Sequence, residues 1–312
     1  MSTISISQAQ RDIRRSVTLK EFDAVLELLA HDPRGPENAD DADYPEWVRH
    51  SVSAGGTKLR VLRYMLDHLP AHAQPRLLDV GAQVGAMAAY AAQLGFAVTA
   101  VDYPHYAKRF SAILAPFGLD YRSCDVSQQP LPFADGAFDF VTYMDVMEHH
   151  SFSPKRVLLE IHRVLAPGGR VLITTPNHAS IYNRMLLLFG RSVNDDFAYH
   201  FHTCEARTPY PGHHREYTRR ELRIALRQTG FRVLECATTE ESLRSQLYAL
   251  RKRKRAFTRW NAHEGFNVLA TAAGRVWGAL GLPFGRLLWA VAEKGEPTQG
   301  APSAPEKLED KV

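Results

Sequence analysis

The feature that most constrains the fold is an alternation of short apolar runs with amphipathic stretches of helical period, which continues from residue 59 to residue 236. Apolar runs bounded by Gly, Pro or Asp predict buried strands, and apolar residues three or four positions apart predict helices that cover a sheet. The expected strands are residues 76–80, 96–102, 119–124, 138–144, 171–173 and 231–236, with 286–292 as a candidate last strand. The expected helices are residues 59–69, 84–94, 106–114, 153–165, 185–189 and 219–228.

Strands that alternate with helices at this spacing predict an α/β fold, in which a mostly parallel sheet is covered on both faces. Right-handed crossovers then make the sheet doubly wound. Residues 1–58 are expected to form a helical N-terminal extension, and residues 59–240 the α/β domain, with 176–217 inserted as a lid over the carboxyl edge of the sheet. Residues 241–294 are expected to be a basic amphipathic helical region with the last strand, and 295–312 a disordered tail.

Charge and cysteine content exclude several classes of protein. The 312-residue chain has a formal net charge of +4, a basic excess too small to indicate a nucleic-acid partner. Cys124, Cys204 and Cys236 are odd in number and far apart, which argues against a disulfide framework and favours a reducing cytoplasm. The first 20 residues are polar and lack the apolar core of a signal peptide.

A basic run at residues 251–255 (RKRKR) follows leucines at helical spacing and precedes several aromatic residues. Such a helix can be solvated on its basic face and packed on the core. Alternatively it can rest on an anionic membrane surface, which would place the protein at the inner face of the membrane.

The segment 79–85, with the sequence DVGAQVG, lies between an expected strand and an expected helix. Glycines in such a turn let the backbone approach a ligand closely, and the helix N-terminus that follows favours an anionic group. Asp102 ends the next strand, where a carboxylate can accept hydrogen bonds from both hydroxyls of a ribose. This edge of the sheet is therefore expected to bind a nucleoside with an anionic arm. The loop has Gln83 at its middle and lacks the G-x-G-x-x-G pattern of dinucleotide sites.

Short segments in a fixed order resemble the class I S-adenosylmethionine-dependent methyltransferase family, near its small-molecule branch with a ubiquinone/menaquinone-methyltransferase-like core. They are LLDVG at 77–81, VD at 101–102, CDV at 124–126, LPF at 131–133, FDFV at 138–141, MEH at 147–149, LAPGG at 165–169, REYT at 215–218 and EL at 221–222, with a weaker echo at 287–294. No single segment is specific, but their order and spacing are. The resemblance implies a Rossmann-like sheet of seven strands, S-adenosyl-L-methionine as the cofactor, and direct transfer of its methyl group to a small-molecule acceptor.

The resemblance also implies which residues bind the cofactor. Asp102 would bind the ribose diol, Tyr103 would lie against the adenine, and Asp125 would accept a hydrogen bond from the adenine amino group. The full expected set is Asp79, Gly81, Gln83, Gly85, Asp102, Tyr103, Asp125, Val126 and Met144. Many members of the family have glycine at the position of Gln83. Asp79 has an alternative, structural role as a cap of the glycine loop and the helix that follows.

Histidines gather in the segments expected at the carboxyl edge. A hydroxyl acceptor must lose a proton as it attacks the methyl group, and a neutral histidine suits that task near pH 7. His149 and His150 follow an expected strand, whereas His213 and His214 lie in the expected lid. His149 is the first candidate base, with His213 and His214 as further candidates. Alternatively, His149 only caps or lines the start of a helix.

Other chemistries are weighed against methyl transfer. His200, His202 and Cys204 alternate and have the ligand types of a metal site, but their spacing matches no recognised pattern, and we predict no metal. A nicotinamide-dependent oxidoreductase would require the dinucleotide fingerprint that the loop lacks. A non-catalytic binding subunit of the same fold is the third alternative, and Gln83 is its best support. The expected partner is a small-molecule acceptor, with oxygen favoured as the methylated atom.

Overall fold

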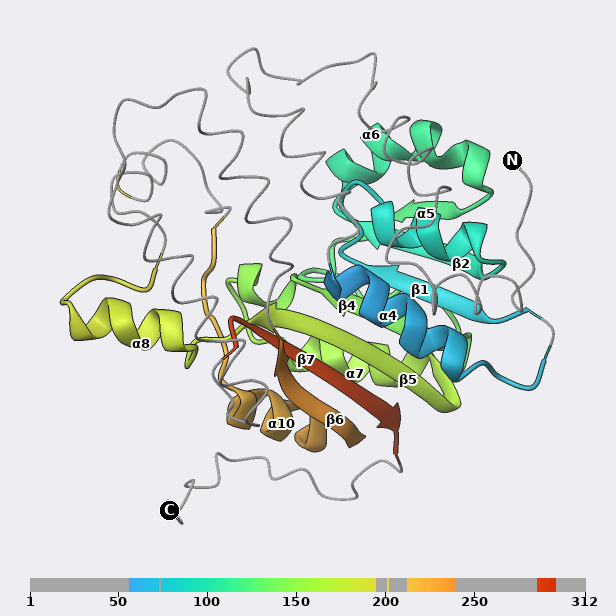
Figure 1. Cartoon of the computed structure of the whole chain (residues 1–312). Coiled ribbons are helices and arrows are strands. Elements are labelled where there is room, and N and C mark those ends of the chain that lie inside the picture. The colour runs from blue at the N-terminus through green and yellow to red at the C-terminus, as the bar shows by residue number, and fades with distance from the viewer. Residues whose placement is uncertain (1–55, 73, 195–200, 202–211, 240–284, 296–312) are drawn as a thin grey trace.

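The computed structural model describes residues 56–72, 74–194, 201, 212–239 and 285–295 (Figure 1). Most of the expected N-terminal extension, the basic run at 251–255 and residues 296–312 of the expected tail lie outside the described residues. Residues 195–200 and 202–211 of the expected lid also lie outside them, including His200, His202 and Cys204.

The fold is built on a seven-stranded sheet of order β3-β2-β1-β4-β5-β7-β6. Its strands are β1 (Arg76–Val80), β2 (Ala97–Asp102), β3 (Asp120–Ser123), β4 (Phe138–Met144), β5 (Leu165–Pro176), β6 (Phe231–Thr239) and β7 (Leu287–Lys294). The pairs β1–β2, β2–β3, β1–β4 and β4–β5 are parallel, whereas β7 is antiparallel to both β5 and β6. The mostly parallel, doubly wound α/β sheet predicted from the sequence is therefore confirmed.

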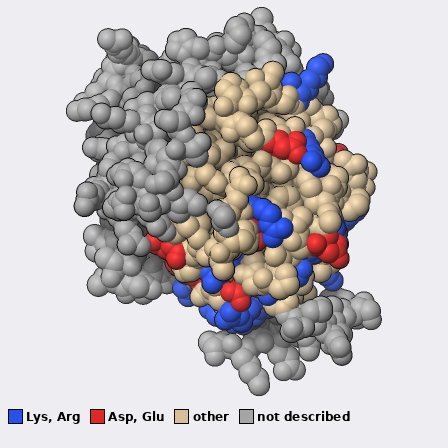
Figure 2. All heavy atoms as spheres, turned by 90° about the vertical axis from the view of Figure 1, so that its right-hand side faces the viewer, with Lys and Arg blue, Asp and Glu red and all other residues tan. Residues whose placement is uncertain are grey.

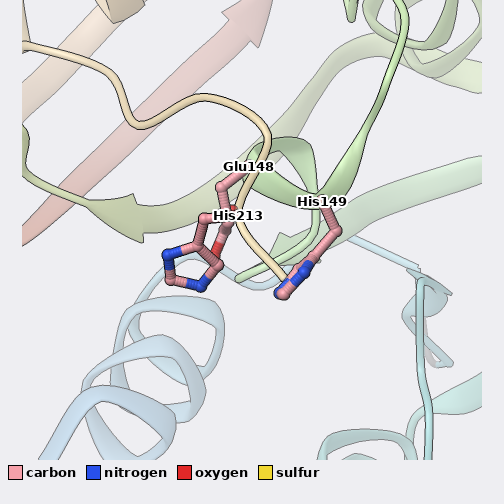
Figure 3. A group of neighbouring side chains, drawn as sticks. All are labelled: Glu148, His149 and His213. Carbon is pink, nitrogen blue, oxygen red and sulfur yellow. The ribbon is translucent and has the colours of Figure 1, made fainter. Parts of the chain in front are cut away.

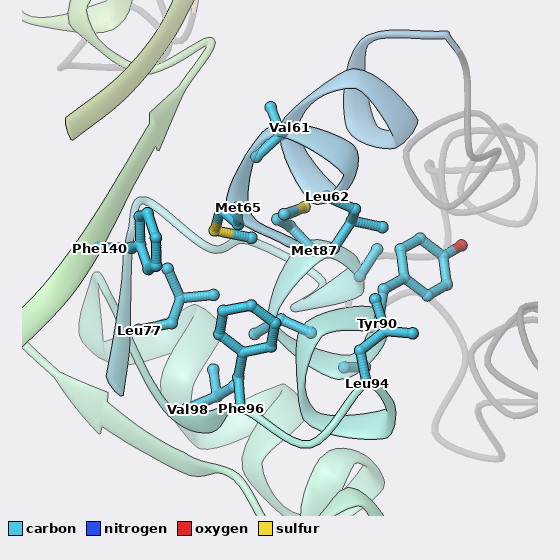
Figure 4. Close-up of a cluster of buried hydrophobic side chains, with 14 of the residues drawn as sticks. Val61, Leu62, Met65, Leu77, Met87, Tyr90, Leu94, Phe96, Val98 and Phe140 are labelled. Atoms are coloured by element: carbon cyan, nitrogen blue, oxygen red, sulfur yellow. The ribbon is translucent and has the colours of Figure 1, made fainter. Parts of the chain in front are cut away.

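Helices cover both faces of this sheet (Figure 1). They are α4 (Gly56–Asp67), α5 (Ala86–Gln93), α6 (Pro104–Leu114), α7 (Lys155–Val164), α8 (Ile181–Leu188) and α10 (Arg219–Gln228), with the short 3-10 helices η1 (Ala115–Phe117) and η2 (Met147–His149). Helices α4, α5 and α6 contribute to one core, part of which Figure 4 shows, and α7 and α10 contribute to the other. Adjacent strand residues alternate between the two: Leu77 of β1 packs in the first core and Leu78 in the second.

Most element boundaries differ from the sequence-based predictions by a few residues, and two of the differences can be traced to particular contacts. The helix expected from residue 153 begins at Lys155, and the Ser153 hydroxyl accepts a hydrogen bond from the Lys155 backbone N–H at 3.3 Å. The strand expected at 171–173 is much longer, because Leu165 already pairs with Phe138 of β4 before a register shift. The proline and glycines at 167–169, expected to end the helix before it, lie within the span of β5.

The surface of the described part carries both signs of charge. Among the described residues on the face in Figure 2, Lys and Arg side chains lie interspersed with Asp and Glu. Among the described helices, none combines the length and the apolar composition that crossing a bilayer requires.

Phe140 tests how much the first core contributes to stability. Its side chain is 2% exposed and meets Phe96 edge to face at a centroid distance of 6.2 Å. Phe140→Ala should lower the free energy of unfolding by ~3–5 kcal/mol, because it removes buried surface and leaves a cavity. Urea denaturation followed by circular dichroism measures this. The control Leu159→Ala, at a side chain 45% exposed in the native structure, should change stability by less than ~1 kcal/mol. Equal effects of the two substitutions would contradict the assigned core.

Candidate functional site

The loop after β1 turns sharply at the carboxyl edge of the sheet. The backbone N–H groups of Gly81 and Ala82 both donate to the carbonyl of Val101 in β2, at 2.9 and 3.2 Å. Gly81, Gln83 and Gly85 all have positive φ, at 76°, 48° and 69°. This left-handed backbone is easy for glycine and costly for most other residues, so the two glycines permit the turn into α5.

Close packing is a second reason why glycine stands at positions 81 and 85. A Cβ atom at Gly81 would collide with the Val146 side chain, and one at Gly85 would collide with Leu114 of α6. The sequence predicted only that a ligand approaches the loop. The structure shows that neighbouring protein side chains also require glycine here.

Asp102 fixes the loop from the end of β2. Its Oδ2 accepts a hydrogen bond from the Gln83 backbone N–H, and its Oδ1 accepts one from the Tyr103 backbone N–H, both at 2.6 Å. The side chain is buried, which raises the pKa of this carboxyl, while the two amide donors lower it. A carboxylate offers about four acceptor positions, so each oxygen retains capacity for a ligand hydroxyl.

Gln83 fits the loop through its backbone. Its N–H donates to Asp102, and its carbonyl accepts a hydrogen bond from the Tyr121 hydroxyl at 2.5 Å. These two bonds hold the residue in its left-handed conformation, so the departure from glycine does not disrupt the loop.

Asp79 lies inside the sheet. It is 3% exposed, and its Oδ1 accepts a hydrogen bond from the Thr142 hydroxyl of β4 at 2.7 Å. Burial raises the pKa of Asp79 to about 6, although hydrogen bonds with Thr142 and the Ala88 backbone lower it. These contacts fit the structural role, in which Asp79 ties β1 to β4 and to the first turn of α5.

Three further residues of the expected cofactor set gather beside Asp102. Tyr103 is 37% exposed at the start of α6, and the charges of Asp125 and Asp102 both raise the pKa of its hydroxyl, after the larger effect of burial. The Oδ1 of Asp125 accepts hydrogen bonds from the Ser127 backbone N–H at 2.9 Å and hydroxyl at 2.6 Å. Val126 follows Asp125 and is half-buried against the second core. An aromatic ring thus lies near two carboxylates on one rim.

Met144, the last expected cofactor residue, ends β4 and is half-buried against the first core. After it, Asp145 has a φ of 53°, held by two hydrogen bonds at 2.9 Å: its N–H donates to the Thr174 carbonyl, and its Oδ1 accepts from the Thr174 hydroxyl. This turn leads directly into η2.

Glu148 on η2 is a residue to which the sequence gave no role. Its side chain is fully buried, and its Oε2 accepts a hydrogen bond from the Thr175 hydroxyl at 3.0 Å. Burial and the nearby charge of Asp145 raise the pKa of Glu148 to about 8. Its backbone carbonyl accepts hydrogen bonds from the N–H groups of His214 at 2.7 Å and Arg215 at 3.2 Å. The described C-terminal end of the expected lid segment, residues 212–217, is therefore fastened to η2.

That fastening brings His213 beside His149 and Glu148 (Figure 3). The two imidazole rings meet edge to face with centroids 4.8 Å apart. The Nδ1 of His149 lies 3.2 Å from the Gly212 carbonyl, and the Nδ1 of His213 lies 3.3 Å from a carboxylate oxygen of Glu216. The structure thus unites two of the three candidate bases in one cluster.

His214 and His150 have other positions. His214 lines a cavity of about 330 Å³ together with His178, His213 and Glu216. His150 is 6% exposed, its Nε2 lies 2.5 Å from the Tyr143 hydroxyl, and its ring stacks on Phe152. Burial lowers the pKa of His150 to about 4, so this residue is a neutral structural group near pH 7.

Comparison with known proteins adds a family match. Residues 15–236 match the sequence profile of a family described as "Methyltransferase domain". A glycine/sarcosine/dimethylglycine N-methyltransferase of Actinopolyspora halophila is 31% identical over 176 residues, which cover 51% of this chain and 31% of that protein. A ubiquinone biosynthesis O-methyltransferase of Pseudomonas aeruginosa is 31% identical over 117 residues, which cover 36% of this chain and 49% of that protein. The chain thus spans less than half the length of these two curated relatives.

A solved structure shares the fold. It is a methyltransferase of Haloferax volcanii in complex with the Trm112 activator, with a TM-score of 0.54 at 16% identity. The match covers 83% of this chain and 98% of that one. At this identity the likeness extends to the fold alone.

The buried neutral His150 makes stability depend on pH. Its pKa in the folded protein, about 4, lies below the value of 6.5 for a free histidine, so the unfolded chain takes up the proton first as pH falls. Between pH 7 and pH 4 the wild type should therefore lose up to ~3 kcal/mol of unfolding free energy relative to His150→Gln, which keeps an acceptor for Tyr143 but does not titrate. Urea denaturation at several pH values measures the difference. Parallel pH profiles for the two proteins would contradict the assignment.

Proposed function

The chain belongs to the methyltransferase domain family, and from that membership we propose that it transfers a methyl group from S-adenosyl-L-methionine to a hydroxyl of a small-molecule acceptor. The observation that carries the cofactor half of the proposal is the rim around Asp102. There a buried carboxylate, pinned by two backbone amides, stands beside an aromatic ring and a second carboxylate, Asp125. This donor and acceptor pattern suits a nucleoside better than a sugar, a peptide or an apolar ligand.

Each part of the rim has a binding task. Asp102 accepts from the ribose hydroxyls, and charged acceptors make strong hydrogen bonds to such donors. Tyr103 would cover the adenine, Asp125 would accept a hydrogen bond from its amino group, and the Val126 backbone N–H would donate to the ring. The glycine loop and the N-terminus of α5 receive the carboxylate of the methionine part, since exposed backbone N–H groups and the helix dipole favour an anion. Met144 borders the same part from β4.

The bound cofactor supplies a methyl group already activated by a positively charged sulfur. The chain must then align the acceptor and keep water out, an effect worth up to ~7–11 kcal/mol of the barrier. In the transfer the acceptor oxygen would bond to the methyl carbon while the carbon–sulfur bond would break, leaving its electron pair on sulfur, and the acceptor hydroxyl would lose its proton. Glu148, His149 and His213 lie just beyond the end of β4, at the edge where ligands of such sheets bind, and we assign to this cluster the task of promoting proton loss.

The rival functions have less support. A nicotinamide-dependent oxidoreductase would need a loop that cradles a pyrophosphate, and the loop here holds Gln83 by hydrogen bonds to Asp102 and Tyr121. The hypothesis of a non-catalytic binding subunit was supported by Gln83, which replaces a glycine common in the family. The backbone of Gln83, however, fits the loop. We therefore retain methyl transfer as the single proposal.

Asp102 offers the sharpest test of the cofactor half. Asp102→Ala should weaken binding of S-adenosylhomocysteine by ~1–3 kcal/mol, about 5- to 150-fold, because it removes a charged hydrogen-bond acceptor. Titration calorimetry measures the affinity. The control Asp135→Ala removes a carboxylate that is 79% exposed and should leave binding unchanged. Unaltered affinity in Asp102→Ala would remove the ribose assignment, and binding of NAD in place of S-adenosylhomocysteine would select the oxidoreductase.

The acceptor half is tested with methyl-labelled S-adenosylmethionine and a panel of phenols, catechols and secondary amines. We expect label to enter methyl ethers, and His149→Ala to reduce that rate ~100-fold or more, since assisted proton transfer contributes about that much. Affinity for S-adenosylhomocysteine should stay unchanged in this variant. Transfer to amines alone would contradict the oxygen assignment, and full turnover in His149→Ala would leave this residue a structural role only.

A further inference from the structure

Three potential metal-ligating side chains converge at the end of β4. Glu148 and His149 come from η2, and His213 comes from the segment after residue 212 (Figure 3). One ligand atom from each residue lies within 4.8 Å of the other two. His213 is half-buried and His149 is exposed, while Glu148 is fully buried. The cluster therefore pairs an interior carboxylate with two imidazoles that are partly open to solvent.

One polar atom of each side chain already has a partner, which leaves the other atom of that side chain as the candidate ligand. The Nδ1 of His149 faces the Gly212 carbonyl, the Nδ1 of His213 faces Glu216, and the Oε2 of Glu148 accepts from the Thr175 hydroxyl. In metal centres, histidine ligands characteristically donate their other ring N–H to a carbonyl or carboxylate, which orients the ring and fixes its tautomer. The arrangement around this cluster is the same.

Glu148 provides an independent observation. Its Oε1 is buried and has no hydrogen-bond partner among the described residues. Leaving a buried carboxyl oxygen unsatisfied is costly, and buried polar atoms in native proteins are mostly paired with protein groups or bound water, a bound ion being one explanation of an exception. The other oxygen is satisfied by Thr175, so the unsatisfied atom is the one available to a cation.

We propose that Glu148, His149 and His213 bind a divalent transition-metal ion of the Zn²⁺ type. Two imidazole nitrogens and one carboxylate oxygen match the preferences of Zn²⁺, whereas Mg²⁺ and Ca²⁺ prefer all-oxygen sites. Ligand atoms of a tetrahedral zinc ion lie about 3.4 Å apart, so side-chain movements of about 1 Å close the site. The Glu148 carboxylate balances one of the two positive charges of the ion. Asp145 and Glu216 stand next to the cluster and supply the negative charge that offsets the other.

Three protein ligands leave a fourth position open, as in catalytic zinc sites. The role of this open coordination position rests on the proposed methyl transfer. A hydroxyl oxygen of the acceptor bound there would lose its proton more readily, because a bound metal ion lowers the pKa of a coordinated water from 15.7 to about 7. His149 and His213 would then act as ligands rather than as bases, and the proton would pass to solvent. This differs from the absence of a metal that we predicted from the sequence.

The full-length protein, stripped with a chelator and dialysed, is titrated with ZnCl₂ by calorimetry, and Co²⁺ is added in parallel for visible spectroscopy. We expect one high-affinity Zn²⁺ per chain and the absorption bands of low-symmetry, four-coordinate Co²⁺. Glu148→Gln and His213→Ala should each weaken Zn²⁺ binding at least 100-fold. Glu216→Gln, which changes the group that orients His213, should weaken it 10- to 100-fold.

His68→Ala is the matched control, because His68 is an exposed histidine on the surface next to α4 that bonds the Tyr64 carbonyl. It should bind Zn²⁺ like the wild type. Binding of S-adenosylhomocysteine is measured on every variant: retained binding shows that the variant is folded and separates the two proposals. Absence of Zn²⁺ binding in a wild type that binds S-adenosylhomocysteine overturns the metal site alone. Zn²⁺ affinity that survives Glu148→Gln and His213→Ala assigns the ion to other residues and also overturns it.

Discussion

Burial of the sheet on both faces is the constraint from which the rest of the structure follows. Six of the seven residues of β4 are buried, and neighbouring residues such as Phe140 and Val141 pack into opposite cores. A strand enclosed in this way offers no free face for polar chemistry. Because four of the strand pairs are parallel, the carboxyl ends of β1, β2 and β4 meet at one edge, and the polar side chains that bind or react must stand there.

Burying carboxylates at this edge costs desolvation free energy, and fixed hydrogen bonds rather than ion pairs offset that cost. Asp102 accepts two backbone amides, and Asp79 accepts the Thr142 hydroxyl. Raised pKa values remain, about 6 for Asp79 and about 8 for Glu148, because burial outweighs these contacts. Asp139 shows the contrast at the opposite end of β4. There Arg76 donates to both carboxylate oxygens, the pKa of Asp139 is lowered, and the residue is purely structural.

Local order in the sequence predicted which edge of the sheet carries the expected cofactor residues. The glycine loop, Asp102, Tyr103 and Asp125 lie near the ends of consecutive strands, so period and topology alone place them together. The other half depends on contacts that no local pattern encodes. His213 reaches Glu148 only because backbone N–H groups 66 and 67 positions further along the chain bond the Glu148 carbonyl. The antiparallel insertion of β7 between β5 and β6 is equally non-local, because pairing with two strands decides it.

Two neighbouring residues at the end of η2 show why residue type alone could not sort the candidate bases. His149 and His150 are adjacent, yet His150 turns inward to Tyr143, and His149 faces His213. The turn at Asp145, held by Thr174 of β5, sets the direction of η2 and therefore which side chain enters the core. Because Thr175, the next residue of β5, bonds Glu148, two successive threonines of one strand position both the turn and the carboxylate. The cluster of Glu148, His149 and His213, to which we assign the acceptor, is thus built on the sheet from one side and on the segment after residue 212 from the other. That segment carries His213, whose charge lowers the pKa of the Glu148 side chain, so the position of the segment affects the charge of Glu148.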